Sequence, residues 1–339
     1  MQNNLESRQF RLIRRPNGLP AQDDFELTTE TLDAPGDGEV AVAVEYISLD
    51  PAMRGWMAEG KSYIEPVGIG DVMRAFAAGT VVASRHPDFA EGDRVTGLMG
   101  AQTHAVMPGT QVNKVDASQL DLPTYIGALG MPGMTAWFGI LEVGELAEGD
   151  RVLVSAASGA VGALVGQIAK KKGATVVGIA GGAEKCAYLT DELGFDGAID
   201  YKSEDVDRAI ATHFPDGLDI FFDNVGGQIL NAALANLRVG ARVVICGAIS
   251  QYNKTNGVGG AEDAPTNYLS LLVNRAKMEG FIILDYIHRY DEAYPQMAEW
   301  IVSGELAHKE DIDEGFDNFV ETLRKLYTGE NFGKLVLKV

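Results

Sequence analysis

Cysteine is scarce in this chain of 339 residues, and Cys186 and Cys246 alone cannot build a disulfide framework. Cations are also few, because 28 Lys and Arg stand against 48 Asp and Glu, for a formal net charge of -20 at pH 7. A nucleic acid or an anionic membrane surface would require an excess of Lys and Arg. The sequence has no apolar run of about 18 residues, and it lacks an apolar signal core near Met1. We therefore expect a cytoplasmic protein with no nucleic-acid partner and no membrane partner.

Metal ligands are equally sparse. A zinc site in a protein takes roughly three or four side chains, usually a mixture of Cys, His and carboxylates. Residues 1–128 contain no cysteine, and their only histidines are His86 and His104. We therefore expect no metal. No histidine lies in a recognisable partner motif for Cys186 or Cys246, so we interpret both thiols as small packing residues rather than nucleophiles.

The pattern of strands and helices changes near Met131. Before it, stretches rich in β-branched residues alternate with Gly, Pro and Asp turns and predict strands at 40–44, 79–83 and 93–97. From Arg151 onward, strands alternate with helix-length segments, which is typical of a doubly wound parallel sheet. The expected strands of that sheet are 152–154, 175–179, 219–222, 242–245 and, as the last one, 281–283.

The tail from about residue 305 contains a helical stretch and a final strand at 334–338, which we expect to return to the first domain. The sequence thus predicts an α/β protein of two domains. Residues 129–304 would form a dinucleotide-binding Rossmann domain. Residues 1–128 together with 305–339 would form a smaller, mostly β domain that contributes to substrate binding and catalysis.

A glycine-bearing turn follows the first strand of the alternating region. The segment from Ala157 to Gly162 has the spacing A-x-G-x-x-G, with Ala157 in place of the usual first glycine. Gly159 would let the backbone approach a pyrophosphate, and Gly162 would let the next helix pack closely on the strand. A tight turn without a ligand would look similar, but the position within a long βαβ series favours dinucleotide binding.

The end of the second strand distinguishes NADPH from NADH. An NAD enzyme usually has an Asp or Glu there, which binds the adenosine ribose hydroxyls. Here Ile179 is followed by Ala180-Gly181-Gly182-Ala183, and then by Lys185, which suits a 2′-phosphate. Lys185 could instead pair with Glu184 or lie on a solvated helix face. We favour NADPH.

Two more turns of small residues follow later strands of this sheet. One contains Asp223-Asn224-Val225-Gly226-Gly227 and the other Cys246-Gly247-Ala248-Ile249-Ser250. Ligands of open α/β sheets bind in the crevice at the carboxyl ends of the strands. Glycines can also serve turns alone, but three such turns on one edge favour contact with a cofactor.

Taken together, the motifs resemble a known family, the prostaglandin reductase and 2-alkenal reductase branch of the medium-chain dehydrogenases/reductases, with bacterial curcumin reductases as the nearest group. The resemblance runs from about Phe10 to the C-terminus. Besides the turns above, it includes Leu49-Asp50-Pro51-Ala52-Met53-Arg54-Gly55, Met131-Pro132-Gly133-Met134-Thr135-Ala136, Gly182-Ala183-Glu184-Lys185, Gln251-Tyr252-Asn253 and Asn331-Phe332-Gly333-Lys334.

The resemblance implies a Rossmann domain, a GroES-like β domain and a set of residues that bind NADPH. The pyrophosphate would lie on Gly159, Ala160, Val161 and Gly162, and Lys185 with Tyr201 would bind the 2′-phosphate. The rest of the cofactor site would comprise Asn224, Cys246, Gly247, Ala248, Ile249, Ser250, Tyr252, Phe281, Ile282, Ile283 and Asn331. Tyr252 and Tyr63 match tyrosines suspected to donate a proton or to anchor the carbonyl in the bacterial relatives.

The chain departs from the family pattern at two positions. Ala52 replaces an aromatic residue, which implies a reshaped substrate pocket, and Val273 stands where the mammalian members often have tyrosine. The second difference puts their lipid substrates in doubt for this chain. The segment Leu49-Asp50-Pro51 also lacks the cysteine that zinc-dependent relatives carry there, so the resemblance implies a zinc-independent enzyme.

Without a metal to polarise a carbonyl, reduction of an activated carbon–carbon double bond is easier to explain than oxidation of an alcohol. A hydride would add to the β-carbon of an α,β-unsaturated ketone or aldehyde, and a hydrogen-bond donor would stabilise the charge on the carbonyl oxygen. Tyr252 is the first candidate donor and Tyr63 the second, although the cofactor ribose could share this role and both tyrosines could merely line an apolar pocket. An NADPH:quinone reductase and a non-catalytic NADPH-binding protein are the alternatives.

The apolar stretch Phe281-Ile282-Ile283-Leu284 is expected to form the edge strand of the sheet. An exposed apolar edge invites pairing with another strand. We therefore expect a homodimer whose subunits join their sheets there.

Overall fold

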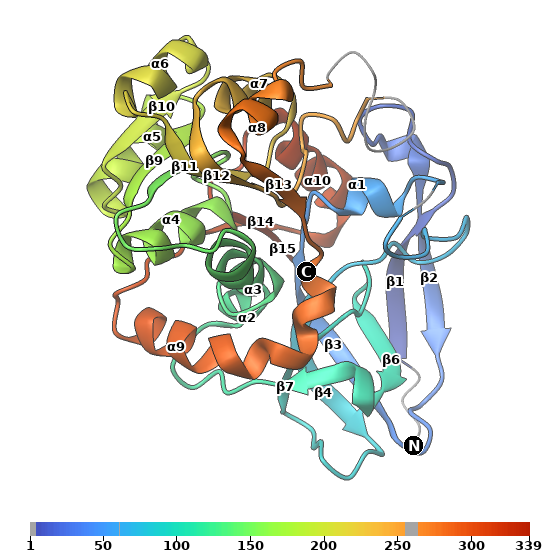
Figure 1. The fold of residues 1–339 in the computed structure, drawn as a ribbon. Coiled ribbons are helices and arrows are strands. Elements are labelled where there is room, and N and C mark those ends of the chain that lie inside the picture. The colour runs from blue at the N-terminus through green and yellow to red at the C-terminus, as the bar shows by residue number, and fades with distance from the viewer. Residues whose placement is uncertain (1–4, 61, 255–263) are drawn as a thin grey trace. The chain divides into compact units, whose positions relative to one another are not determined.

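The computed structural model describes residues 5–60, 62–254 and 264–339. These residues fall into two compact units (Figure 1). Unit 1 contains the described residues up to 127 and from 310 onward, and unit 2 contains those from 128 to 309. The predicted boundaries lay at 128/129 and 304/305, so the return to unit 1 comes five residues later than the sequence suggested.

Unit 2 contains a six-stranded parallel sheet in the described residues, with the strand order β10-β9-β8-β11-β12-β13. This is the order of a Rossmann sheet, in which the first strand lies in the middle and the order reverses between β8 and β11. The strands are β8 (Arg151–Val154), β9 (Thr175–Ala180), β10 (Gly197–Asp200), β11 (Leu218–Asp223), β12 (Leu237–Ile245) and β13 (Lys277–Gly280). The helices are α3 (Met131–Phe138), α4 (Gly162–Lys171), α5 (Ala183–Ala187), α6 (Val206–His213), α7 (Gly227–Ala235), α8 (Leu269–Asn274) and α9 (Tyr290–Val302).

The central strands are apolar because both faces of a parallel sheet are covered. Every residue of β11 is buried. The sequence predicts one buried face with Val161, Val165, Ile168 and Ala169 on the first helix after β8. The structure buries every residue of this helix from Gly162 to Ala169, whereas Val161, just before it, is half-buried. It ends with two lysines, and Gly173 follows with a φ of +85°, a conformation that only glycine adopts without strain.

The prediction of a last strand at 281–283 was wrong. The edge strand is β13, four residues earlier, and Ile283 begins a 3-10 helix that extends to Arg289. Phe281 is half-buried and contacts residues distant in sequence: its ring lies 6.3 Å from that of Tyr286, edge on, and it lies against Gly139. These contacts therefore prevail over its preference for a strand.

Unit 1 contains a seven-stranded sheet and a separate two-stranded sheet, β1-β2, in the described residues. The larger sheet has the order β14-β15-β3-β4-β5-β7, with β6 paired to β3. The strands are β1 (Leu5–Leu12), β2 (Phe25–Leu32), β3 (Glu39–Ser48), β4 (Ala77–Ser84), β5 (Arg94–Gly97), β6 (His104–Pro108), β7 (Val112–Lys114), β14 (Glu310–Glu314) and β15 (Lys334–Lys338). The helices are α1 (Met53–Trp56), α2 (Leu122–Ile126) and α10 (Phe319–Thr328).

The C-terminal tail belongs to unit 1, and its last strand pairs antiparallel with β3. The helix before that strand is held by aromatic packing. Phe10 of β1 lies 5.1 Å from the ring of Phe316 and 5.0 Å from that of Phe319. Buried aromatic rings contribute much of the apolar area of a small core, so the two ends of the chain stabilise one unit together.

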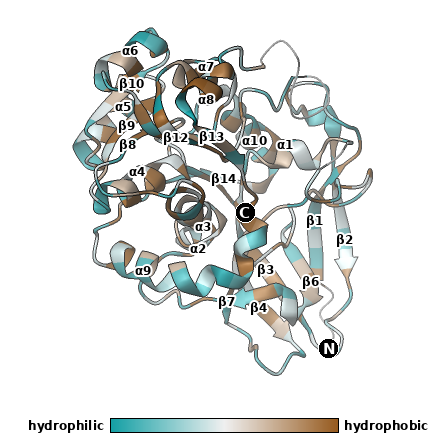
Figure 2. Cartoon of the chain, in the orientation of Figure 1, coloured by the Kyte–Doolittle hydropathy of each residue, from teal (hydrophilic) through white to brown (hydrophobic). Residues whose placement is uncertain are grey.

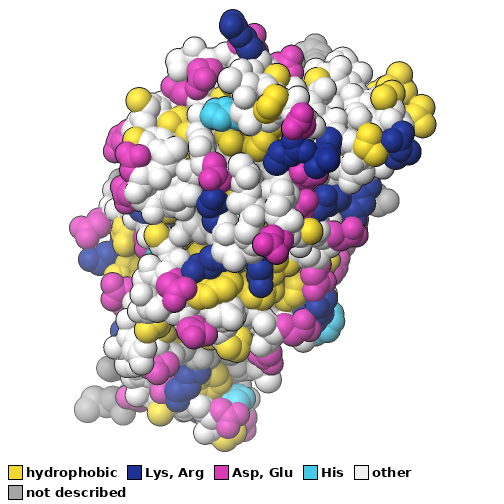
Figure 3. All heavy atoms as spheres, turned by 60° about the vertical axis from the view of Figure 1, so that its left-hand side comes forward, with side chains coloured by type: hydrophobic (Ala, Val, Ile, Leu, Met, Phe, Trp, Pro, Cys, Tyr) yellow, Lys and Arg dark blue, Asp and Glu magenta, His cyan; other side chains and the backbone are white. Residues whose placement is uncertain are grey.

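Polar and apolar residues segregate as expected for a globular protein. In Figure 2, β3 is coloured mostly as hydrophobic, whereas α6 carries hydrophilic residues. On the face shown in Figure 3, acidic side chains are scattered among basic and apolar ones and do not gather into one patch. Within the described residues, no helix is long and apolar enough to cross a membrane.

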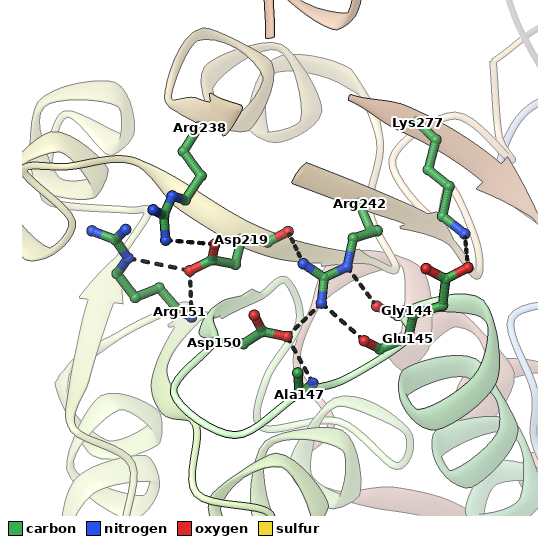
Figure 4. A network of polar contacts seen from close by, with 9 residues as sticks. All are labelled: Gly144, Glu145, Ala147, Asp150, Arg151, Asp219, Arg238, Arg242 and Lys277. Atoms are coloured by element: carbon green, nitrogen blue, oxygen red, sulfur yellow. Dashed lines mark hydrogen bonds and ion pairs between the residues drawn. The ribbon is translucent and has the colours of Figure 1, made fainter. Parts of the chain in front are cut away.

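A network of ion pairs joins the strands of unit 2 at their amino ends (Figure 4). Asp219 accepts hydrogen bonds from Arg151 Nε at 3.2 Å and from Arg238 Nη1 at 2.9 Å. Arg242 pairs with Asp150 and donates to the backbone carbonyls of the loop before β8. These residues lie at the opposite end of the strands from the glycine turns, so we assign them to the stability of the sheet.

Candidate dinucleotide site

The turn between β8 and α4 has the geometry that a phosphate-binding turn requires. A Cβ atom on Gly162 would lie 2.5 Å from the carbonyl oxygen of Ala156 and 2.8 Å from Cα of Ala157, closer than any real side chain allows. Gly162 is therefore needed for the close packing of helix and strand that the sequence predicts. Ala156 has a φ of +47°, which is uncommon outside glycine and bends the backbone sharply after the strand.

The alanine in place of the first glycine has a structural explanation. Ala157 is fully buried, and its amide donates to Ile179 O at 2.9 Å, which ties the turn to β9. Its methyl group lies against Gly178, where an added Cβ would be only 2.6 Å away. The methyl group of Ala157 thus fills the space that a first glycine would leave empty. Gly178 on the neighbouring strand has no side chain that would collide with it.

A buried polar network joins the carboxyl ends of β8 and β11, at the point where the strand order reverses. Ser155 Oγ donates to Asp223 Oδ1 at 2.9 Å and accepts the amide of Asn224 at 2.8 Å. Asp223 also accepts the amides of Val225 and Gly226, at 2.9 and 3.0 Å. Burial raises the pKa of Asp223, and these hydrogen bonds oppose the shift. The network fixes Asn224, a predicted cofactor ligand, in the crevice where such sheets bind ligands.

The turn after β12 packs against the turn after β11. A Cβ atom on Gly227 would lie 2.8 Å from Gln251 Nε2 and 3.0 Å from Ser250 Oγ. Ser250 Oγ donates to Val225 O at 2.7 Å and accepts Gln251 Nε2 at 2.7 Å, which fixes the orientation of that amide. The hydroxyl oxygen of Tyr252 accepts the amide of Ala248 at 3.1 Å. Two segments that are distant in sequence thus form one wall of small residues.

This wall offers a buried acceptor that the described residues do not satisfy. Gln251 is 6% exposed, and its Oε1 atom has no hydrogen-bond donor among them. A buried acceptor without a partner is costly and usually marks a ligand or an ordered water. Gly227 lies next to this amide, because a Cβ atom there would be 2.8 Å from Gln251 Nε2. The site therefore fits a dinucleotide that brings its own hydrogen-bond donors, such as ribose hydroxyls.

The turn after β9 carries no carboxylate on its first residues, as the sequence indicates. Gly182 has a φ of +97°, and its amide donates to Asp200 Oδ1 at 2.8 Å, so the acid of the neighbouring strand caps this turn. Lys185 lies on α5, directly after the turn. The ring of Tyr201 lies against Gly181 and is 44% exposed. The two residues expected to bind a 2′-phosphate therefore flank the same turn.

The remaining predicted cofactor residues occupy diverse positions. Ile282 and Ile283 follow β13 at the carboxyl edge of the sheet, and Ile283 is buried. Asn331 belongs to unit 1, where its side chain donates to Gly333 O at 3.1 Å. Burial raises the pKa of the Cys246 thiol to about 12 and also raises that of Cys186. Neither thiol is ionised near neutral pH, so neither is an activated nucleophile.

Tyr63 lies in unit 1 and half of its surface is exposed. Its hydroxyl oxygen accepts the indole N–H of Trp56 at 2.9 Å. An indole nitrogen can only donate, so the phenol keeps its own proton for another acceptor. Burial raises the pKa of Tyr63, mainly through desolvation. Of the two family departures, Ala52 packs against the core of unit 1, and Val273 lies exposed on α8.

Sequence analysis missed the residues that support the site rather than line it. Ser155 and Trp56 bind other side chains and have no spacing motif of their own, whereas Asp223 belongs to a recognised turn but was not predicted as a supporting residue. A serine and an aspartate at the carboxyl ends of two adjacent apolar strands are the one available signal. As for metals, no group of three or more Cys, His, Asp or Glu side chains in the described parts of the chain could hold an ion.

Comparison with known proteins agrees with this geometry. A family model described as "N-terminal domain of oxidoreductase" matches residues 8–115, and one described as "Zinc-binding dehydrogenase" matches residues 160–303. The chain is 40% identical to the NADPH-dependent curcumin reductase of Escherichia coli, covering 98% of this chain and 97% of that protein. It is 39% identical to the 2-alkenal reductase (NADP(+)-dependent) of Nicotiana tabacum, covering 100% and 99%.

A solved structure shares the whole fold. The crystal structure of CurA in complex with NADPH, from Vibrio vulnificus, has a TM-score of 0.91 and 42% identity, and the match covers 98% of this chain and 99% of that one. Two family models, two enzymes of more than a third identity and this structure all agree with the glycine turns and the strand order of unit 2. The chain therefore belongs to the oxidoreductases of the medium-chain dehydrogenase/reductase family, in the branch of the curcumin, 2-alkenal and prostaglandin reductases.

Proposed function

We propose that this protein is an NADPH-dependent reductase of the carbon–carbon double bond in α,β-unsaturated ketones and aldehydes. The observation that carries the proposal is a phenol, Tyr252, in the wall of small residues at the carboxyl edge of the sheet. A phenol is neutral near pH 7 and can donate a hydrogen bond to a carbonyl oxygen. The tobacco relative, which is named for 2-alkenals, supports this substrate class.

The chain's own residues would hold NADPH as follows. The turn from Gly159 to Gly162 takes the pyrophosphate, because only small residues let the backbone approach so closely. Lys185 and Tyr201 take the 2′-phosphate. Asn224, the turn after β12 and the residues after β13 line the remainder of the molecule. When bound, the cofactor supplies a hydride.

The residues of this chain then stabilise the charge that develops on the substrate. As hydride adds to the β-carbon, negative charge builds on the carbonyl oxygen, and a neutral donor aimed at that oxygen lowers the barrier. Tyr252 is the first candidate, because it lies in the turn that lines the cofactor. Tyr63 is the second candidate, and its bond from Trp56 orients the phenol. The α-carbon takes its proton afterwards from a tyrosine hydroxyl or from solvent.

Two variants test this assignment. If Tyr252 is the donor, Tyr252→Phe should lower kcat on a 2-alkenal about 10²–10³-fold, because that is the usual effect of losing one such donor. If Tyr63 is the donor, Tyr63→Phe should have this effect instead. Tyr268→Phe, on an exposed tyrosine before α8, is the matched control. Full turnover in the double variant of Tyr252 and Tyr63 would remove both from the mechanism.

A substrate panel tests the reaction class itself. Purified protein should oxidise NADPH in the presence of enals and enones, and much more slowly with NADH. Fast turnover of quinones with none of enones would assign a quinone reductase instead. Binding of NADPH without turnover of either class would leave a non-catalytic binding protein.

We also propose a homodimer. Leu269, Leu272 and Val273 share one side of α8 and are 56%, 75% and 69% exposed. The chain continues from this helix to β13, which has a strand on only one side in the described residues. An open edge beside an apolar helix face suits a second copy of the same surface. Light scattering should give about twice the chain mass of 36.3 kDa, and Leu272→Lys should reduce it to one chain; a wild-type monomer would contradict the proposal.

A further inference from the structure

The turn after β10 lies beside the turn after β9. The two strands are paired in parallel, with Asp200 opposite Ala180 at their carboxyl ends. A Cβ atom added to Gly181 would lie 2.8 Å from Cε1 of Tyr201 and 2.9 Å from Cε of Lys202. Both side chains therefore fold back over Gly181, at the end of the strand where an NAD enzyme would carry its carboxylate.

The position of Lys202 is fixed by the acid that precedes it. Asp200 Oδ1 accepts the amide of Gly182 at 2.8 Å and the amide of Lys202 at 3.0 Å, while Oδ2 accepts Ser203 Oγ at 2.8 Å. These donors lower the pKa of Asp200, so it stays ionised and clamps the two turns together. The backbone of Lys202 is thus held at a defined distance from the turn after β9.

The ammonium group of Lys202 differs from those of three other lysines of unit 2. Lys170, Lys171 and Lys277 each pair with a carboxylate at 2.7 to 2.9 Å. Lys202 is exposed and makes no side-chain hydrogen bond or ion pair with the residues that the structure describes. Asp200 lies nearby and would repel a phosphate dianion, so a cation is needed if a phosphate is to bind at this edge.

We propose that Lys202 is a second cation for the adenosine 2′-phosphate, next to Lys185, and that it is a determinant of specificity for NADPH over NADH. This inference rests on the proposed function, because it assumes that unit 2 binds NADPH. The stem of Lys202 crosses Gly181, and its charge stands where a ribose-binding carboxylate would otherwise favour NADH. Tyr201 packs against the same glycine and limits where the stem can lie.

Binding to the purified apo-protein tests the inference without reference to turnover. The ligands are NADPH, NADH, 2′,5′-ADP and 5′-ADP, titrated by calorimetry at low salt. Lys202→Met keeps the apolar stem and removes the charge. We expect this variant to bind NADPH and 2′,5′-ADP about tenfold more weakly, because a hydrogen bond to a charged group typically contributes that much to the affinity. The affinities for NADH and 5′-ADP should change by less than about twofold. Added salt should reduce the difference in NADPH affinity between the wild-type protein and the variant.

Two further variants complete the test. Lys202→Arg keeps the charge and should retain most of the affinity for 2′,5′-ADP. Lys172→Met is the matched control, because Lys172 is an exposed lysine that follows α4 and lies before the amino end of β9, away from the carboxyl ends of the strands. An unchanged NADPH affinity in Lys202→Met, or an equal loss for NADH, would overturn the inference. Wild-type protein that binds neither NADPH nor 2′,5′-ADP would instead overturn the proposed function, so the two failures are distinct.

Discussion

Replacement of Lys334 by methionine should destabilise unit 1 strongly. Lys334 of β15 and Asp50 after β3 form a buried ion pair, with Nζ and Oδ1 2.7 Å apart and side-chain exposures of 5% and 7%. The ammonium also donates to Leu49 O at 2.9 Å, and Ser48 Oγ donates to Asp50 Oδ2 at 2.5 Å. Lys334→Met would leave the carboxylate buried with the serine as its only side-chain donor among these groups.

The expected loss follows from the desolvation of that carboxylate. Removing one partner of a buried pair typically costs about 3–5 kcal/mol, because the other charge remains without compensation. For a unit of this size the loss corresponds to a melting temperature lower by roughly 6–20 °C. Lys334→Met combined with Asp50→Leu should cost less than the sum of the two single changes, because the double variant buries no charge.

Scanning calorimetry of the full chain measures this effect, and β15 provides its own control. Lys338 pairs with Glu314 at 3.1 Å, but both side chains are largely exposed, at 48% and 74%. Exposed pairs contribute little to stability, so Lys338→Met should leave the melting temperature nearly unchanged. If Lys334→Met melts no lower than Lys338→Met, or if the double variant shows simple additivity, the buried pair is not what holds β15 to the end of β3.

Three further predictions follow from other parts of the chain. Gly178→Ala should cost about 1–3 kcal/mol in urea unfolding, because its Cβ would lie 2.6 Å from that of Ala157, and Ala157→Gly should recover part of the loss. Asp219→Ala should lower the free energy of unfolding by about 1–3 kcal/mol in the same measurement, because Arg151 and Arg238 lose the acceptor of their hydrogen bonds. The affinity for NADPH, measured by calorimetry, should stay unchanged, because these residues lie away from the site. Burial holds the pKa of Tyr63 above 10.0, so its protonated form persists as pH rises; if Tyr63 is the donor, kcat/KM on an enone should stay level to about pH 9, and a fall centred near pH 8 would exclude it.

The sequence was most informative where local rules and tertiary structure agree. Three lysines and a glycine after the apolar residues of α4 predict where this helix ends. The spacing from Gly159 to Gly162 predicts the turn before it. Each of these features depends on neighbours within a few residues, so a single sequence records them fully.

The prediction failed where a distant contact decided the outcome. Phe281 and its neighbours have the composition of a strand, yet the ring packs on Gly139 and Tyr286, and the more polar segment at 277–280 forms the edge. The short strand β10 was also missed, because Gly197-Ala198-Ile199-Asp200 is too brief for a periodic pattern. Its pairing with β9 is what brings Asp200 to the turn at Gly182.

The alanine in the turn after β8 connects these two cases. A fingerprint of glycines states a need for space, but the space can be provided from either side of a contact. Here the methyl group of Ala157 occupies the space, and Gly178 on β9 leaves it free, because a Cβ atom on Gly178 would lie only 2.6 Å from that methyl group. The turn taken alone has a weakened motif, whereas Ala157 in the turn and Gly178 on β9 together satisfy the same packing requirement. Departures from such fingerprints are therefore best judged against the strand that packs on the turn.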